Sequence, residues 1–472
     1  MTPPPAPAMA GAESNAAAAV AAGRRRHVLL FPLPYQGHIN PMFRLAGVLH
    51  ARGFAVTVFH TLFNAPDPAR HPEYRFVPVP DDVPGPATAA VDDVVTHILA
   101  LNAACEAAFR DRLAAVVEEY SRDAVACLVA DAHWLTMVEV AARLGVPTLA
   151  LRTGSAACFV GFLAYPMLCE KGYLPVQESQ LDMPVSELPP YRVRDLLRLG
   201  KDGHDLAREL CARAVAAVKA SSGFILNTFD ALERDELADV RRDLAVPVFD
   251  VGPLHKFCPA GESSLQRQDR SCLEWLDTMP PASVLYVSFG SLACMTQNDL
   301  AETAWGIAGS GVPFLWVIRR GLVAGHAGEA GQLLPEGFEA ATRGRGVVVD
   351  WAPQEEVLRH RAVGGFWTHN GWNSTTESVC EGVPMLCRPY FGDQMGNARY
   401  VEHVWRVGFE VRGELERGGV EAAIRRLMAD GDGAEMRARA GELKKAAAAA
   451  CAGKGASSCL AIDKLVAHIM SL

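Results

Sequence analysis

Short apolar runs alternate with helical stretches along almost the whole chain, in two successive series. The apolar runs of the first series are residues 27–34, 54–59, 124–131, 147–153, 222–229 and 246–253. Those of the second are residues 283–291, 313–319, 346–351, 363–369 and 384–390. Each run has the continuity of a strand buried on both faces, and helices between such strands build parallel sheets. The sequence therefore predicts an α/β fold with two doubly wound, Rossmann-like domains facing each other across a cleft.

The domain boundaries follow from the segment between the two series. Residues 254–272 are polar and lack apolar periodicity, so we expect them to form an interdomain linker. This places one domain at residues 24–253 and a second at residues 273–455. Residues 1–23 are rich in Pro and Ala without an early basic residue, which favours a disordered extension over a signal peptide. A plastid transit peptide is less favoured, because this segment has only one serine and one threonine.

Composition excludes several classes of protein. The net charge is −9 and no Lys/Arg-rich stripe occurs, which argues against a nucleic-acid partner. No apolar run reaches the length of a membrane span, so we expect no stable membrane insertion. The twelve cysteines form no Cys-x-x-Cys pair, which is typical of a reduced, cytoplasmic protein. We expect a cytoplasmic monomer.

The segment PYQGHINP places a histidine directly after the first apolar run. Asn40 is a suitable N-cap with Pro41 at the first helical position, so we expect His38 in the loop that precedes this helix. Asp131 and Thr153 stand at the ends of two later strands. The carboxyl ends of parallel strands share one edge, where ligands bind in open α/β sheets. For His38 alone, a solvated or capping loop histidine is the alternative.

A phosphate site is predicted in the second half of the chain. The stretch THNGWNSTTES, residues 368–378, reads as a strand end, a Gly-containing turn and a helix start. The first turn of a helix offers unpaired N–H groups and a partial positive charge, which bind phosphates. His369, Asn373 and Ser374 add side-chain donors at the same point. Each residue taken singly also fits a capped helix beside buried aromatic side chains.

Neighbouring residues suit the rest of a nucleotide sugar. Glu377 can accept hydrogen bonds from a ribose diol, and Trp351 can stack on a planar base. Asp393 and Gln394 place acceptors and donors side by side, which suits a hexose. The ordered set within residues 351–394 therefore favours a nucleotide-sugar site over coincidence.

Residues 351–394 resemble the signature box of the plant UDP-sugar-dependent glycosyltransferases that modify small molecules. The resemblance covers nearly the whole chain after residue 26, including PYQGHINPM and YVSFGS. It implies the GT-B fold, in which the C-terminal domain holds the UDP-sugar and the N-terminal domain holds the acceptor. It also implies that a final helix, residues 456–472, packs back on the N-terminal domain.

The resemblance further implies which residues bind the UDP-sugar. In chain order they are Thr153, Ser291, Trp351, Ala352, Gln354, His369, Gly371, Trp372, Asn373, Ser374, Glu377, Phe391, Gly392, Asp393 and Gln394. Trp351 and Ala352 would contact uracil, while Gln354 and Glu377 would bind the ribose.

Two further groups of residues are implied for the rest of the donor. Those for the diphosphate are Ser291, His369, Asn373 and Ser374. Those for the sugar are Thr153, Trp372, Asp393 and Gln394. In this family a glutamine at the position of Gln394 accompanies a preference for glucose, so the implied donor is UDP-glucose.

The same resemblance implies the catalytic residues. His38 would be the general base, since a neutral imidazole can take a proton from an acidic hydroxyl. Asp131 would fix its tautomer and stabilise the imidazolium. The acceptor oxygen attacks the anomeric carbon in line, and an α-linked donor gives a β-glucoside. We expect no cofactor and no metal, because the Asp-x-Asp at residues 430–432 reads as a turn, and helix N–H groups with His369 can stabilise the leaving UDP.

The acceptor is less strongly encoded. The N-terminal half resembles grass enzymes that glucosylate benzoxazinoid hydroxamic acids such as DIMBOA, with cytokinin and flavonoid glucosyltransferases close by. We therefore expect a small apolar metabolite: a benzoxazinoid hydroxamic acid, a flavonoid, a cytokinin or another phenolic. Phe159, Phe162 and Tyr165 either line an acceptor pocket or form the core of a helix. His133 and His360 are expected to be structural or surface residues.

Two rival classes of enzyme lack their sequence motifs in this chain. A hydrolase lacks its Gly-x-Ser-x-Gly motif here, and a dehydrogenase lacks Gly-x-Gly-x-x-Gly after the first strand. A non-catalytic nucleotide-sugar sensor on the same fold is the remaining alternative.

Overall fold

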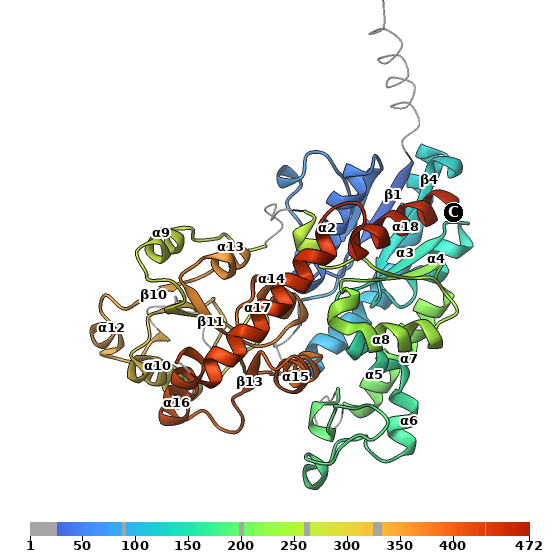
Figure 1. The fold of residues 1–472 in the computed structure, drawn as a ribbon. Coiled ribbons are helices and arrows are strands. Elements are labelled where there is room, and N and C mark those ends of the chain that lie inside the picture. The colour runs from blue at the N-terminus through green and yellow to red at the C-terminus, as the bar shows by residue number, and fades with distance from the viewer. Residues whose placement is uncertain (1–25, 87–90, 198–202, 259–264, 324–332, 430) are drawn as a thin grey trace, which may run out of the picture.

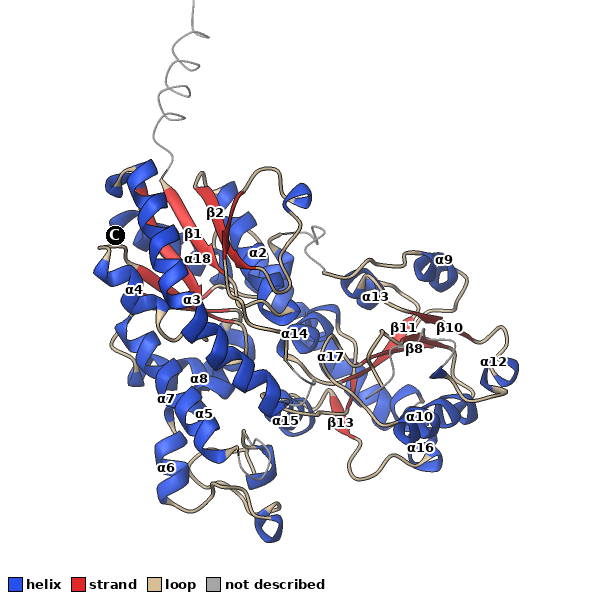
Figure 2. Cartoon of the chain, turned by 180° about the vertical axis from the view of Figure 1, so that it is seen from behind, coloured by secondary structure: helices blue, strands red, loops and turns tan. Residues whose placement is uncertain are grey.

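The computed structural model describes residues 26–86, 91–197, 203–258, 265–323, 333–429 and 431–472. The expected extension at residues 1–23 and Asp430 of the Asp-x-Asp turn lie outside them. Two α/β domains stand next to each other, the first coloured blue to green and the second yellow to red in Figure 1. Each is built on its own parallel sheet (Figure 2). The predicted fold class is confirmed.

The N-terminal sheet has seven strands in the order β3-β2-β1-β4-β5-β6-β7. They are β1 (His27–Phe31), β2 (Ala55–Thr61), β3 (Arg75–Val79), β4 (Val125–Asp131), β5 (Thr148–Arg152), β6 (Gly223–Leu226) and β7 (Val248–Asp250). The helices of this part are α2 (Gln36–Ala51), α3 (Val91–Tyr120), α4 (Met137–Arg143), α5 (Ala156–Leu163), α6 (Tyr165–Glu170), α7 (His204–Ala220) and α8 (Asp230–Asp243).

The C-terminal sheet has six strands in the order β10-β9-β8-β11-β12-β13. They are β8 (Val284–Ser288), β9 (Phe314–Val317), β10 (Gly346–Val349), β11 (Val363–Thr368), β12 (Met385–Cys387) and β13 (Gly408–Glu410). The helices of this part are α9 (Ser271–Asp277), α10 (Gln297–Ser310), α12 (Phe338–Ala341), α13 (Gln354–Arg359), α14 (Trp372–Glu381), α15 (Gln394–Arg399), α16 (Arg417–Met428), α17 (Asp432–Cys451) and α18 (Ser457–Ser471).

Burial on both faces explains the continuous apolar strands. In β1, Leu29 and Phe31 join one hydrophobic cluster, while Val28 and Leu30 join another on the opposite face. Interior strands of such a sheet have no solvated face, which explains their nearly continuous apolar runs.

Helix α18 belongs spatially to the first domain. Figure 1 shows it in red beside β1 and β4, after α17 has run along the second domain. Ile462, Leu465 and Ile469 are buried in the same cluster as Val28. The last helix therefore ties the end of the chain to the N-terminal sheet.

Helix α2 begins earlier than expected. It starts at Gln36, so His38 lies in its first turn and not in a loop. Pro41 is inside the helix and has no N–H to donate to the carbonyl of Gly37, four residues earlier. That carbonyl accepts instead from Asn373 Nδ2 of the C-terminal domain, at 2.9 Å. The carbonyl that Pro41 leaves without a helical partner is therefore satisfied by the other domain.

The segment between the domains is partly packed. Leu254 and His255 are buried, and Leu254 joins the N-terminal hydrophobic cluster. Helix α9 begins at Ser271. Among the described residues, none of the helices combines the length and apolar character that crossing a membrane requires.

Candidate active site

A cavity of about 720 Å³ lies between the two domains. In the N-terminal sheet the strand order reverses between β1 and β4, and in the C-terminal sheet it reverses between β8 and β11. Ligands of doubly wound folds bind at these switch points, at the carboxyl ends of the strands. His38 follows β1 and Asp131 ends β4, whereas Ser291 follows β8 and His369 follows β11.

The structure brings the expected site residues together. All of the expected UDP-sugar-binding residues line this cavity, and so does His38. Asp131 does not line it, because its side chain is fully buried behind His38. Thr153 lines the cavity and its Oγ1 lies 3.0 Å from His38 Nδ1.

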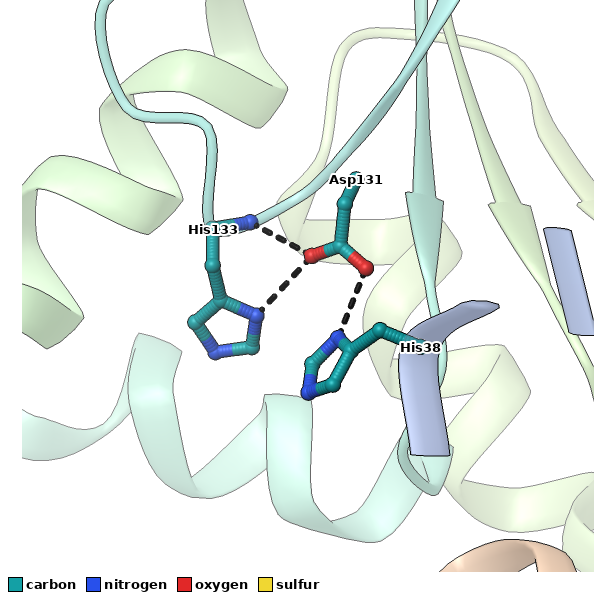
Figure 3. Close-up of side chains that lie close together, drawn as sticks. All are labelled: His38, Asp131 and His133. Atoms are coloured by element: carbon teal, nitrogen blue, oxygen red, sulfur yellow. Dashed lines mark hydrogen bonds and ion pairs between the residues drawn. The ribbon is translucent and has the colours of Figure 1, made fainter. Parts of the chain in front are cut away.

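His38 is held by one ring nitrogen. Its Nδ1 lies 2.7 Å from Asp131 Oδ2, and the carboxylate stands between the rings of His38 and His133 (Figure 3). Burial alone would raise the pKa of Asp131, but the charge of His38 and hydrogen bonds from both imidazoles hold this pKa well below its ordinary value. An ionised carboxylate only accepts, so in the neutral ring of His38 the proton is on Nδ1 and the Nε2 lone pair is free.

Two residues of this cluster were not predicted. His133, expected to be structural or a surface residue, lines the cavity and places Nδ1 3.1 Å from Asp131 Oδ1. Arg152 Nη1 lies 2.9 Å from His133 Nε2. A sequence signal for Arg152 existed, since it is the only charged residue in the otherwise apolar run 147–153. His360, in contrast, contacts Asp277 away from the cavity, at 3.1 Å.

His38, Asp131 and His133 have the chemistry of metal ligands, and their donor atoms lie within 4.8 Å of one another. However, both Asp131 oxygens accept hydrogen bonds from the imidazoles, and His133 Nε2 faces the cationic Arg152. We therefore interpret the cluster as a chain of hydrogen bonds.

We call the wall of the cavity that carries the residues expected to bind the UDP-sugar the donor side. On this side, two glycines leave room for the His369 ring. A Cβ at Gly290 would lie 2.5 Å from the His369 ring, and a Cβ at Gly371 would lie 2.6 Å from its Nε2. Gly290 also has φ +71°, which favours glycine. Burial, aided by the charge of Arg319, lowers the pKa of His369 to about 4. A neutral His369 thus stands before the first turn of α14, where N–H groups have no helical partner.

A second group of residues expected to bind the UDP-sugar surrounds Glu377. Gln354 Nε2 donates to Glu377 Oε2 at 2.7 Å and to Ser374 Oγ at 2.8 Å. Burial, together with the charge of Glu355, raises the pKa of Glu377 to about 8. Trp351 and Ala352 line the cavity beside this group.

The expected sugar-binding residues have defined orientations. Gln394 Oε1 accepts from the backbone N–H groups of Tyr390 and Phe391, at 2.9 and 3.2 Å, so its Nε2 remains as a donor. Asp393 Oδ2 accepts from Asn397 Nδ2 at 3.1 Å. Trp372 donates its indole N–H to the Asn227 carbonyl at 2.9 Å, which leaves its ring for contact in the cavity.

The three aromatic residues considered for an acceptor pocket differ in where they lie. Phe162 lines the cavity. Phe159 is fully buried and packs on Phe224, with ring centroids 4.5 Å apart. Tyr165 is buried and stacks on His204. Phe159 and Tyr165 are therefore core residues, and among the three only Phe162 lies where it can meet a bound molecule.

The first turn of α14, which we expect to bind phosphate, and the carboxylate-bound His38 of the other Rossmann-like domain line the same cavity. This arrangement defines the class of nucleotide-sugar transferases with the GT-B fold.

Comparison with known proteins supports this class. Residues 86–437 match the family model described as UDP-glucoronosyl and UDP-glucosyl transferase. The chain is 52% identical over 433 residues to DIMBOA UDP-glucosyltransferase BX8 of Zea mays, covering 89% of this chain and 94% of that relative. It is 51% identical over 432 residues to BX9 of the same plant, covering 90% and 92%.

A solved structure matches with a TM-score of 0.80 and 28% identity, over 94% of this chain and 99% of the other. It is Phytolacca americana UGT2 complexed with UDP-2fluoro-glucose and pterostilbene. The chain therefore belongs to the UDP-glucoronosyl and UDP-glucosyl transferase family. It is an enzyme, a UDP-glucosyltransferase, and the sensor alternative finds no support.

Proposed function

We propose that this enzyme transfers glucose from UDP-glucose to a hydroxyl of a small apolar metabolite with inversion, and that His38 is the general base. One observation carries the proposal. His38 is anchored to Asp131 through Nδ1, at 2.7 Å, in the same cavity as the residues assigned to the donor. A neutral ring that donates from Nδ1 has its Nε2 lone pair free to accept a proton. Nε2 takes the proton of the acceptor hydroxyl while its oxygen attacks the anomeric carbon, and UDP leaves.

The donor residues divide the UDP-glucose among them. Trp351 and Ala352 bind uracil, and Gln354 with Glu377 binds the ribose. The first turn of α14, His369 and Ser291 hold the diphosphate and stabilise its charge as the bond breaks. Asp393 and Gln394 bind the glucose hydroxyls. No metal is needed in this arrangement, and we propose that none takes part.

A benzoxazinoid hydroxamic acid such as DIMBOA is the first acceptor to test, since the two maize relatives are named for it. The N-terminal wall of the cavity includes a set of apolar side chains, which suits contact with an apolar ring. Its apolar residues are Val94, Val95, Ile98, Phe162, Leu197 and Leu210. Flavonoids, cytokinins and simple phenols are the remaining candidates.

We further propose that the enzyme works as a cytoplasmic monomer. All twelve cysteines are free, which suits a reducing compartment. A sizing column coupled to light scattering tests the monomer.

The deciding experiment measures UDP release from UDP-glucose with DIMBOA, a flavonol, a cytokinin and a simple phenol, with and without EDTA. The same panel is run on His38→Ala. We expect turnover with at least one acceptor, insensitivity to EDTA, and loss in the variant while UDP-glucose binding persists. Turnover that survives in His38→Ala would refute the assignment of the base, and inhibition by EDTA that added metal reverses would refute the metal-free mechanism.

A further inference from the structure

His133 has both ring nitrogens engaged although no role was assigned to it. Its Nδ1 faces Asp131 Oδ1 at 3.1 Å, and its backbone N–H donates to the same oxygen at 2.9 Å. Its Nε2 faces Arg152 Nη1 at 2.9 Å. Figure 3 shows that His133 and His38 take opposite oxygens of one carboxylate.

These contacts fix the proton on His133. A guanidinium has only donors, so His133 Nε2 must be the acceptor of the Arg152 hydrogen bond. The single ring proton is then on Nδ1, where it is donated to Asp131. His133 is therefore neutral. Burial acts in the same direction and, with the charge of Arg152, lowers its pKa to about 4 against the opposing effect of Asp131.

Arg152 is itself held firmly in this position. It is 4% exposed, its guanidinium stacks on Phe162 at 4.4 Å, and Nη2 donates to Cys158 Sγ at 3.1 Å. Within the described part of the chain, no carboxylate lies within ion-pairing distance of it. Its charge acts on His133, which it contacts, and at longer range on Asp393.

We propose that Arg152 and His133 are positioning residues of the base: Arg152 keeps His133 neutral, so that the full charge of Asp131 stabilises the imidazolium formed on His38. This inference rests on the proposed role of His38. The two imidazole centroids are only 5.3 Å apart. A proton on His133 would neutralise Asp131 in advance and repel the charge that His38 gains during the reaction.

The charged and titratable groups around His133 come from several elements. Asp131 is on β4, His38 on α2 and Arg152 on β5. Asp393, from the C-terminal domain, acts electrostatically on Arg152 and His38. Of these groups, Arg152 alone both touches His133 and opposes its protonation by charge at every working pH, because a guanidinium does not deprotonate.

The test follows the dependence of kcat/KM for the acceptor on pH, from about pH 5 to about pH 9, at saturating UDP-glucose. We expect the acid limb of the wild-type profile to follow a single protonation. In Arg152→Met, His133 is free to bind a proton on Nε2. We expect a second proton-dependent step in its acid limb, which costs up to about tenfold more per pH unit below that step.

Three companion variants separate this effect from structural damage. Arg152→Lys keeps a cationic donor and should retain the one-proton limb. His133→Gln cannot titrate and should also retain it. The double variant Arg152→Met/His133→Gln should lose the second step that Arg152→Met alone acquires, which a merely damaged site would not do.

A one-proton limb in Arg152→Met, or a second step that persists in the double variant, would overturn the proposal. If Arg152→Met does not fold, the imidazole NMR signal that is lost in His133→Gln gives the answer in the wild type. We expect no titration of this signal between about pH 5.5 and about pH 8, and a titration there refutes the proposal. Activity that survives in His38→Ala instead refutes the base assignment, so the two failures are distinguishable.

Discussion

The two halves of the cavity are built in contrasting ways. On the donor side, almost every expected residue comes from one continuous segment, residues 351–394, around the helix start of α14. On the base side, the residues come from α2, β4 and the end of β5, far apart in the sequence.

Their buried carboxylates differ as well. Burial tends to raise the pKa of both carboxylates. At Asp131 the two imidazoles overcome this tendency and lower the pKa, whereas Glu377 has Glu355 as a neighbour and reaches about 8. The base side therefore lowers the pKa of its carboxyl group, and the donor side raises the pKa of its own.

The largest effect should come from removing the fixed charge. In Asp131→Asn, an amide replaces the carboxylate that anchors His38 Nδ1, so the ring loses both its tautomer preference and its counter-charge. We expect kcat to fall by about 10²- to 10⁴-fold. The dissociation constant of UDP-glucose, measured by calorimetry, should stay unchanged because Asp131 does not line the cavity. A kcat within about threefold of the wild type would contradict the contrast between the two sides.

The next effect concerns the donor side alone. In Gly290→Ala, the added Cβ meets the His369 ring at 2.5 Å, and the residue must keep φ +71°. We expect UDP to bind about tenfold more weakly and stability to fall by about 1–2 kcal/mol.

Gly441→Ala is the matched control for this substitution. Gly441 is in α17 and a Cβ there would have nothing within 4 Å, so alanine should leave UDP binding unchanged and slightly stabilise the protein. Equal UDP affinity in the two variants, measured by calorimetry, would show that His369 does not depend on Gly290.

The sequence predicted most strands of the two sheets but missed two of them. The strands that it missed, β3 and β13, are both at sheet edges. β3 contains the exposed Pro78 and begins with Arg75, and β13 consists of Gly, Phe and Glu, so neither shows a continuous apolar run. Interior strands were found because burial on both faces forces apolar continuity.

The residues of the site were likewise predicted only in part. The donor residues share one segment, so their order and spacing could be recognised directly. His133 and Arg152 acquire meaning only when β4 and β5 pair side by side, and this pairing is a tertiary fact. The predicted start of α2 was wrong for a similar reason, because the partner of the Gly37 carbonyl comes from the other domain.

A smaller effect should divide the acceptor wall from the core behind it. Phe162 lines the cavity and Phe159 is fully buried, although both are in α5. Phe162→Leu should change the acceptor KM by about three- to tenfold, since the lost contact is with the substrate. Phe159→Leu should lower stability by about 1–2 kcal/mol and leave the acceptor KM unchanged. Steady-state kinetics and thermal melting would reveal a reversal of these roles.

The smallest effect tests the protonated carboxyl group of the donor side. The folded-state pKa of Glu377, about 8, lies above its ordinary value of 4.5. Between these values the folded state holds a proton that the unfolded state has released. Stability contributed by this proton is therefore complete below about pH 4.5 and is lost as the pH rises toward 8.

Glu377→Gln carries no such proton, and its amide has nearly the same shape. We expect the melting temperature of the ligand-free wild type to fall by a few degrees relative to Glu377→Gln as the pH rises through this window, as measured by calorimetry. A constant difference between the two proteins would mean that Glu377 is already ionised. The donor side would then hold a fixed charge like that of Asp131, and the contrast between the two carboxylates would be lost.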